Sequence, residues 1–167
     1  MENKLTKEDK ELLVKDLTGR LPYAVTVEHT NTGMRGTLRD LVVYPTYNED
    51  DTVKDYICTT NFFGDGDYFY IEYFKPYLFP MSSMSEEQKK ELLELAGYEA
   101  RCEESCGFDS WGFYVNIVGD YKYEDNQESI ILYPDDIGID WLNKNHFDYR
   151  GLIEKGLAID ATGKNIY

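Results

Sequence analysis

Residues 6–33 read TKEDKELLVKDLTGRLPYAVTVEHTNTG, and their hydrophobic pattern changes along the way from a helical period to a strand period. Leucines at positions 13, 17 and 21 form one stripe, so we expect a helix over 6–20 with Thr6 and Asp9 as a capping pair. The dipeptide Leu21-Pro22 ends this helix, because the residue before a proline disfavours the helical region. Residues 23–28 then alternate between two faces, and a turn at 31–33 predicts a return strand over 34–44.

The same patterns continue along the chain. Further strands are predicted at 53–59, 68–74, 111–118 and 128–133, helices at 85–96 and 139–146, a loop at 76–80 and a last helical turn at 152–157. This mixture of elements predicts an α+β fold, in which an antiparallel β-sheet of about five to six strands packs with three to four helices. The length of 167 residues fits a single domain over 1–167.

Negative charge is concentrated in two stretches of the sequence. The chain has 32 acidic and 17 basic side chains, which gives a net charge of −15. Residues 48–74 carry seven acidic and one basic side chain, and residues 99–140 carry eleven and two, so their net charges are −6 and −9. Charges of one sign repel one another and destabilise a fold. The two stretches therefore either keep the protein soluble or attract a basic partner.

The sequence shows no targeting or membrane signal. Its start, MENKLTKEDK, is polar and charged, and no run of about 18 apolar residues occurs. The three cysteines, Cys58, Cys102 and Cys106, are few and odd in number, which argues against a disulfide framework. We therefore expect a cytoplasmic protein in a reducing compartment.

Two stretches resemble parts of metal sites without completing them. Cys102 and Cys106 have a spacing compatible with zinc, but no second pair accompanies them, so we expect free thiols. The stretch 65–67, Asp-Gly-Asp, resembles the start of a calcium loop, yet Pro76 stands where the bidentate glutamate belongs. The sequence therefore predicts no metal and no other cofactor.

No residue pattern predicts catalysis. His29 and His146 belong to no recognisable motif with a nucleophile, and no carboxylate pair stands out among so many acidic residues. Glycine-rich phosphate loops and basic stripes are missing, which argues against direct binding of nucleic acid. We expect the protein not to be an enzyme.

Rows of carboxylates can approach the charge density of a phosphate backbone, because alternate residues of a strand lie about 6.6 Å apart on one face. Residues 120, 124 and 128 share such a parity, two tyrosines beside them are candidate anchors, and residues 49–51 form a second cluster. The predicted partner-binding residues are Glu49, Asp50, Asp51, Asp120, Glu124, Asp125 and Glu128, with Tyr121 and Tyr123 as aromatic contacts. The expected partner is a basic protein surface, such as the cleft of a nucleic-acid-binding enzyme.

The C-terminal part resembles a group of other proteins. Residues 139–158, IDWLNKNHFDYRGLIEKGLA, resemble a segment of uncharacterised small proteins of gut anaerobes and their phages, and 17–23 and 75–84 resemble other parts of that group. The resemblance carries no activity, and it marks 99–130 as an insertion relative to shorter relatives. The association with phages implies an inhibitor of a host defence enzyme, of the anti-CRISPR or anti-restriction type.

The sequence thus leads to one expected function and two alternatives. We expect an acidic protein-binding module, in the phage setting an inhibitor that mimics DNA or RNA. The first alternative is a structural or interaction protein whose acidity serves only solubility. The second is an enzyme of a class that the sequence does not reveal.

Overall fold

The computed structural model describes residues 5–61, 69–95, 104–109, 112–120, 127–132 and 136–167. The chain divides into two compact units, one formed by residues 1–78 and 152–167 and the other by residues 79–151. Within the described residues, three α-helices accompany a mixed five-stranded sheet and two three-stranded sheets, which confirms the predicted α+β class. That the chain is a single domain over 1–167 stays a prediction.

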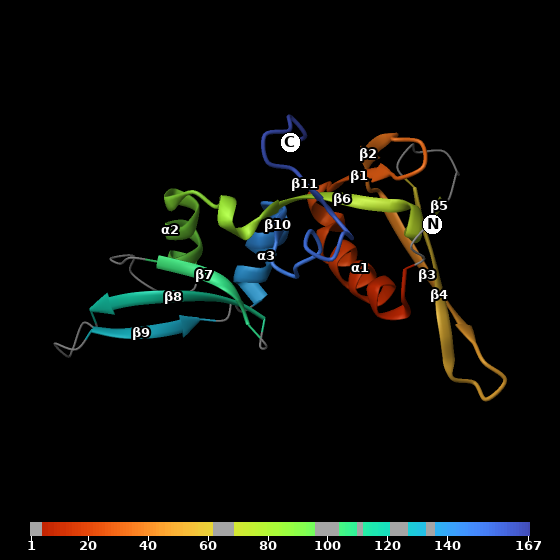
Figure 1. Cartoon of the computed structure of the whole chain (residues 1–167), viewed down its shortest axis with the longest axis horizontal. Coiled ribbons are helices and arrows are strands. Elements are labelled where there is room, and N and C mark those ends of the chain that lie inside the picture. The colour runs from red at the N-terminus through yellow and green to blue at the C-terminus, as the bar shows by residue number, and fades with distance from the viewer. Residues whose placement is uncertain (1–4, 62–68, 96–103, 110–111, 121–126, 133–135) are drawn as a thin grey trace. The chain divides into compact units, whose positions relative to one another are not determined.

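The first unit begins with helix α1, Lys7–Arg20 (Figure 1). The predicted capping pair is present: the Thr6 hydroxyl accepts the Asp9 N–H at 3.1 Å, and the Asp9 carboxylate accepts the Thr6 N–H at 3.1 Å. A 3-10 turn, η1 (Leu21–Tyr23), follows with its proline in the first turn, as predicted for a stop at that point. The leucine stripe therefore does face a core, as predicted, with Leu13 and Leu17 fully buried.

The five-stranded sheet is built around strand β6, Phe74–Pro80. Strand β1 (Thr26–His29) pairs with it antiparallel and also pairs with β2 (Arg35–Thr37), while β10 (Phe147–Asp148) and β11 (Ile159–Asp160) pair with β6 in parallel. The loop predicted at 76–80 is therefore wrong. The Thr30 N–H donates to the Tyr73 carbonyl at 2.7 Å. Hydrogen-bonded and non-hydrogen-bonded pairs alternate along an antiparallel ladder, so the nitrogen of Pro76 points away from β1. Pairing with β11 starts only at Tyr77, so the missing N–H breaks no ladder hydrogen bond.

A second sheet of the first unit has the order β3-β4-β5, with β3 (Asp40–Tyr47), β4 (Val53–Asn61) and the short β5 (Phe69–Tyr70) all antiparallel. The single return strand predicted over 34–44 is wrong, because β2 and β3 belong to different sheets. The strand predicted over 68–74 is also broken, by the 3-10 turn η2 (Ile71–Tyr73). Pro45 lies inside β3 instead of ending a strand. β3 is an edge strand, and a proline whose nitrogen faces the open edge of a sheet removes no hydrogen bond between strands.

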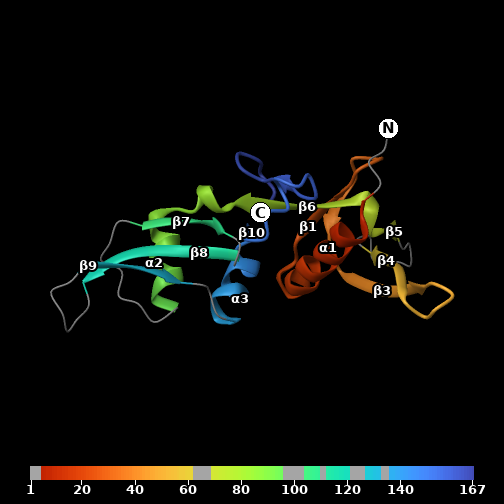
Figure 2. The same cartoon turned by 60° about the horizontal axis from the view of Figure 1, so that its bottom comes forward.

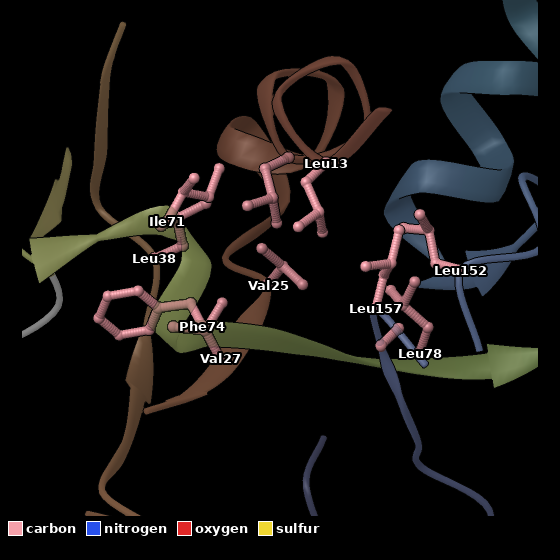
Figure 3. Close-up of a cluster of buried hydrophobic side chains, with 11 residues drawn as sticks. Leu13, Val25, Val27, Leu38, Ile71, Phe74, Leu78, Leu152 and Leu157 are labelled. Carbon is pink, nitrogen blue, oxygen red and sulfur yellow. The ribbon is translucent and has the colours of Figure 1, made fainter. Parts of the chain in front are cut away.

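The core of the first unit is one apolar cluster (Figure 3). It brings together α1, β1, β6 and the turns after residue 151, and its buried members are Leu13, Leu17, Val25, Val27, Leu38, Ile71, Phe74, Leu78, Leu152, Leu157 and Ala158. Residues 152–157 contribute from hydrogen-bonded turns, so the helical turn predicted there is wrong. Removing this apolar surface from water is the main favourable term that holds the unit together.

Two ion pairs reinforce α1. Arg20 donates to both carboxylate oxygens of Asp16, at 2.7 and 2.9 Å, and neither side chain is exposed. Lys10, whose side chain is 5% exposed, lies 3.1 Å from the Glu72 carboxylate and so ties α1 to η2. Buried charges of this kind need their partners, because an unpaired charge in the interior is strongly destabilising.

The second unit contains α2 (Glu86–Leu95), α3 (Asp136–Lys144), the 3-10 turn η3 (Met81–Ser83) and a meander of β7 (Glu104–Asp109), β8 (Gly112–Asp120) and β9 (Gln127–Leu132) (Figure 2). The helix predicted over 85–96 is present as α2 and begins with a capping pair, because the Ser85 hydroxyl accepts the Gln88 N–H at 3.2 Å. The sequence patterns do not predict β7, and β8 extends two residues past the predicted strand end at 118. The core of this unit consists of Met81, Met84, Leu92, Trp141, Leu142, Phe147 and Tyr149.

Candidate binding site at the β3–β4 turn

The turn between β3 and β4 holds the first predicted acidic cluster in a defined geometry. The Asn48 N–H donates to the Thr52 carbonyl at 2.8 Å, and the Asp51 N–H donates to the Asn48 carbonyl at 3.1 Å. Asp51 has a φ of +61°, in the left-handed region. A three-residue loop that closes in this way is a common hairpin connection, and glycine or asparagine is favoured at its left-handed position.

Asp50 fixes the turn from within. Its carboxylate accepts the Thr52 N–H at 3.1 Å and the Thr52 hydroxyl at 2.7 Å, and the Asn48 side-chain amide donates to the same hydroxyl at 2.9 Å. The hydrogen bonds from Thr52 lower the pKa of Asp50 below its ordinary value. This carboxylate is therefore ionised at neutral pH, and much of its hydrogen-bonding capacity is used inside the turn.

Glu49 and Asp51 are placed differently. Both are exposed, and within the part of the chain that the structure describes neither side chain takes part in a hydrogen bond or an ion pair. A non-glycine residue in the left-handed region is strained by about 1 kcal/mol or more, although aspartate tolerates it better than most. Two carboxylates are thus exposed to solvent on a hydrogen-bonded turn, and one of them lies where glycine would relieve backbone strain.

The turn carries an aromatic neighbour that no sequence pattern marks as a binding residue. Tyr47, at the end of β3, is 57% exposed and lines a shallow open depression together with Asn48, Glu49 and Asp50. The register of β3 and β4 shifts between Thr46 and Tyr47, which marks a bulge at this end of the hairpin. In Figure 1 the β3–β4 hairpin continues past the end of α1, so the turn lies at the free end of the hairpin. Chemically, this end offers negative charge and an aromatic ring together.

The other predicted partner-binding residues lie elsewhere. Asp120 ends β8 and Glu128 lies in β9, where the register pairs Asp120 with Gln127 and Glu128 with Gly119. The chain reverses direction between these two residues, so the single-strand row of alternate carboxylates over 120–128 is wrong. Tyr121, Tyr123, Glu124 and Asp125 lie outside the described residues. Glu49–Asp51 belong to the first unit and Asp120 and Glu128 to the second.

A second polar cluster, on β1, β2 and β6, has a structural role. The Glu28 carboxylate accepts a hydrogen bond from the Tyr77 hydroxyl and another from Arg35 Nε at 2.8 Å. The Tyr77 hydrogen bond lowers the pKa of Glu28, while burial and this carboxylate raise the pKa of Tyr77 to about 12. Neither group changes its charge near neutral pH, so the cluster is not poised for proton transfer.

The remaining candidates for chemistry do not assemble into a site within the described residues. His29 is buried, with its ring 5.7 Å from that of Tyr73 and edge-on to Phe74 at 5.3 Å. His146 is buried at the end of α3 with a φ of +58°. Among the described residues no three histidine, cysteine or acidic side chains are grouped as metal ligands. Cys102 and the stretch 65–67 lie outside the described residues.

No described helix combines the length and apolar character needed to cross a membrane. Comparison of the chain with protein-family models, with curated proteins and with solved structures found no match.

Proposed function

We propose that this protein is a non-enzymatic binding module that docks its acidic surface onto a basic surface of another protein. The observation that carries the proposal is the pair Glu49 and Asp51, two exposed carboxylates without a described partner at the end of a hydrogen-bonded hairpin. Asp51 keeps a carboxylate at a φ of +61°, where a glycine would fit with less strain. A charge that is kept at the expense of backbone strain points to use by a partner.

The surrounding charge supports the same proposal. Residues 48–74 have a net charge of −6, so their field attracts a basic surface and speeds its encounter with the turn. Basic clefts that hold a phosphate backbone are surfaces of this kind. We propose such a nucleic-acid-binding enzyme as the target, in a reducing cytoplasm, with the protein acting as a phage-type inhibitor that mimics nucleic acid.

A second candidate function is that the acidity only keeps the protein soluble. The observation that favours it is Asp50, whose carboxylate stabilises the turn and needs no partner for its presence to be explained. Solubility depends on net charge and not on which carboxylates carry it. The two candidates therefore differ in whether the position of a charge matters.

A pair of matched variants separates these candidates. Glu49→Gln with Asp51→Asn removes two charges at the turn, and Glu11→Gln with Glu154→Gln removes two exposed charges elsewhere in the same unit. We expect a partner co-purified from host lysate to bind the parent and the control variant alike and to bind the turn variant at least tenfold more weakly. Its affinity for the parent should also fall as salt rises. Equal loss of binding in the two variants, or no loss of binding in either variant, would contradict the proposal.

A further inference from the structure

The sheet β3-β4-β5 has one face toward α1 and one face away from it. α1 contacts both β3 and β4, and Leu41 of β3 packs against the core that α1 lines. Side chains alternate along a strand, so Val42 and Tyr44 lie on the opposite face. Tyr44 is 57% exposed there, although a tyrosine ring is large and largely apolar.

The strand register places a second exposed tyrosine on that same outer face. Val42 pairs with Thr59 of β4, and Thr59 pairs with Tyr70 of β5, so these three positions form one row across the sheet. Tyr44 lies two residues along β3 from Val42, which puts its Cα roughly 12 Å from that of Tyr70 by ordinary strand spacings. Tyr70 is 53% exposed, and Tyr73 supports its ring edge-on at a centroid distance of 6.5 Å. The outer face thus offers two aromatic platforms.

We propose that this outer face binds an arginine-bearing basic segment of the partner protein, with guanidinium groups stacked on Tyr44 and Tyr70. The inference rests on the proposed function and adds the chemistry of the partner. Charge complementarity selects the occupant, because residues 48–74 carry a net charge of −6 and the unpaired carboxylates of Glu49 and Asp51 belong to the same hairpin.

Arginine fits this surface better than lysine. Its planar guanidinium stacks on an aromatic ring while its N–H groups still reach carboxylates, whereas the lysine ammonium is a compact and strongly hydrated charge. The protein itself contains the arrangement on another sheet. The Arg35 guanidinium lies 5.1 Å from the centre of the Tyr77 ring and donates to Glu28 at 2.8 Å.

Two other occupants of the face fit less well. Tyrosine platforms also stack nucleobases, but single-stranded nucleic acid needs a positively charged groove, and here the neighbouring turn is acidic. A second copy of the chain would bring another net charge of −15 against the first.

Two peptides of equal charge, nona-arginine and nona-lysine, test the inference on the full chain by fluorescence anisotropy at two salt concentrations. We expect the arginine peptide to bind the parent about three- to tenfold more tightly, the order that two exposed ring contacts supply. Tyr44→Thr with Tyr70→Thr should bring the ratio of the two affinities close to one, and Tyr44→Phe with Tyr70→Phe should keep it, because phenylalanine retains the ring face.

The outcomes also separate this inference from the proposed function. Salt-sensitive binding of both peptides with equal affinity, weakened by Glu49→Gln with Asp51→Asn, would overturn the inference and support the function. A preference for arginine that survives Tyr44→Thr with Tyr70→Thr would overturn it as well. Binding of neither peptide would overturn both. An oligothymidylate that binds more tightly than nona-arginine would show that the platforms serve nucleic acid instead.

Discussion

The left-handed Asp51 gives the sharpest test of the turn geometry, because its replacement by glycine should weaken partner binding without lowering stability. Asp51 has a φ of +61°, and an alanine there is strained by about 1–2 kcal/mol relative to glycine. Glycine has more freedom in the unfolded chain, which offsets about 0.4–1 kcal/mol of this gain. We therefore expect Asp51→Gly to be as stable as the parent or up to about 1 kcal/mol more stable, and Asp51→Ala to be about 1 kcal/mol less stable.

Thermal unfolding followed by circular dichroism measures this order. For a chain of this length a difference of 1 kcal/mol corresponds to roughly 2–4 °C in Tm, so the glycine and alanine variants should differ by a few degrees. Asp51→Asn keeps a residue that tolerates the left-handed region and removes only the charge, so its Tm should stay near that of the parent. All three variants should bind the partner more weakly than the parent. Equal Tm values for the glycine and alanine variants would refute the left-handed assignment, and undiminished partner binding by the asparagine variant would refute the role of the charge.

Two further predictions concern the first unit. Asp16→Ala should destabilise the protein by about 3–5 kcal/mol in urea unfolding, because it leaves Arg20 buried without its bidentate partner, whereas Asp16→Leu with Arg20→Met should recover most of that loss. A double variant as unstable as the single one would contradict this reasoning. The lowered pKa of Glu28 implies stability that is present above its ordinary value near 4.5 and is lost as pH falls through the lower folded value. The stability difference between the parent and Tyr77→Phe should therefore shrink below about pH 4.5, and a difference that grows on acidification would show that the hydrogen bond does not lower this pKa.

The elements that were predictable from the sequence carry their signals locally. Thr6 and Asp9 predict the start of α1, and the leucine stripe predicts which side of the helix is buried. Both signals depend on residues only three or four positions apart. Trp141 and Leu142, two apolar residues of the helix predicted over 139–146, are buried in the second unit. Apolar residues at helical spacing carry this signal without any knowledge of the rest of the fold.

The missed elements depend on partners that are distant in sequence. Residues 76–80 look like a loop because of two prolines, yet they form most of β6, whose neighbours β10 and β11 lie about seventy residues or more further along the chain. Strands as short as these two have no alternation of their own to detect. The split of 34–44 between two sheets was also not predictable, since the sequence pattern of β2 and β3 alone does not say which strand each one joins.

The candidate site was predictable only in part. Composition identified Glu49, Asp50 and Asp51, but it gave them one shared role, whereas the turn uses Asp50 internally and leaves the other two toward solvent. Tyr44 and Tyr70 share a face only through the register of β4 between them, which no local pattern contains. Within the sequence, only the alternation over 40–47 indicates that a tyrosine of this strand faces away from the core.

Backbone amide chemical shifts of the isotopically labelled full chain, recorded as nona-arginine is added, show whether the β3–β4 turn and the outer face of its sheet bind a basic partner. We expect the largest perturbations at Glu49–Asp51, Tyr44 and Tyr70, and we expect them to decrease as salt is added. Perturbations of the same size at the exposed acidic residues of α2, Glu86, Glu87 and Glu91, would mean that the peptide responds to net charge alone, and the β3–β4 turn would then be no binding site.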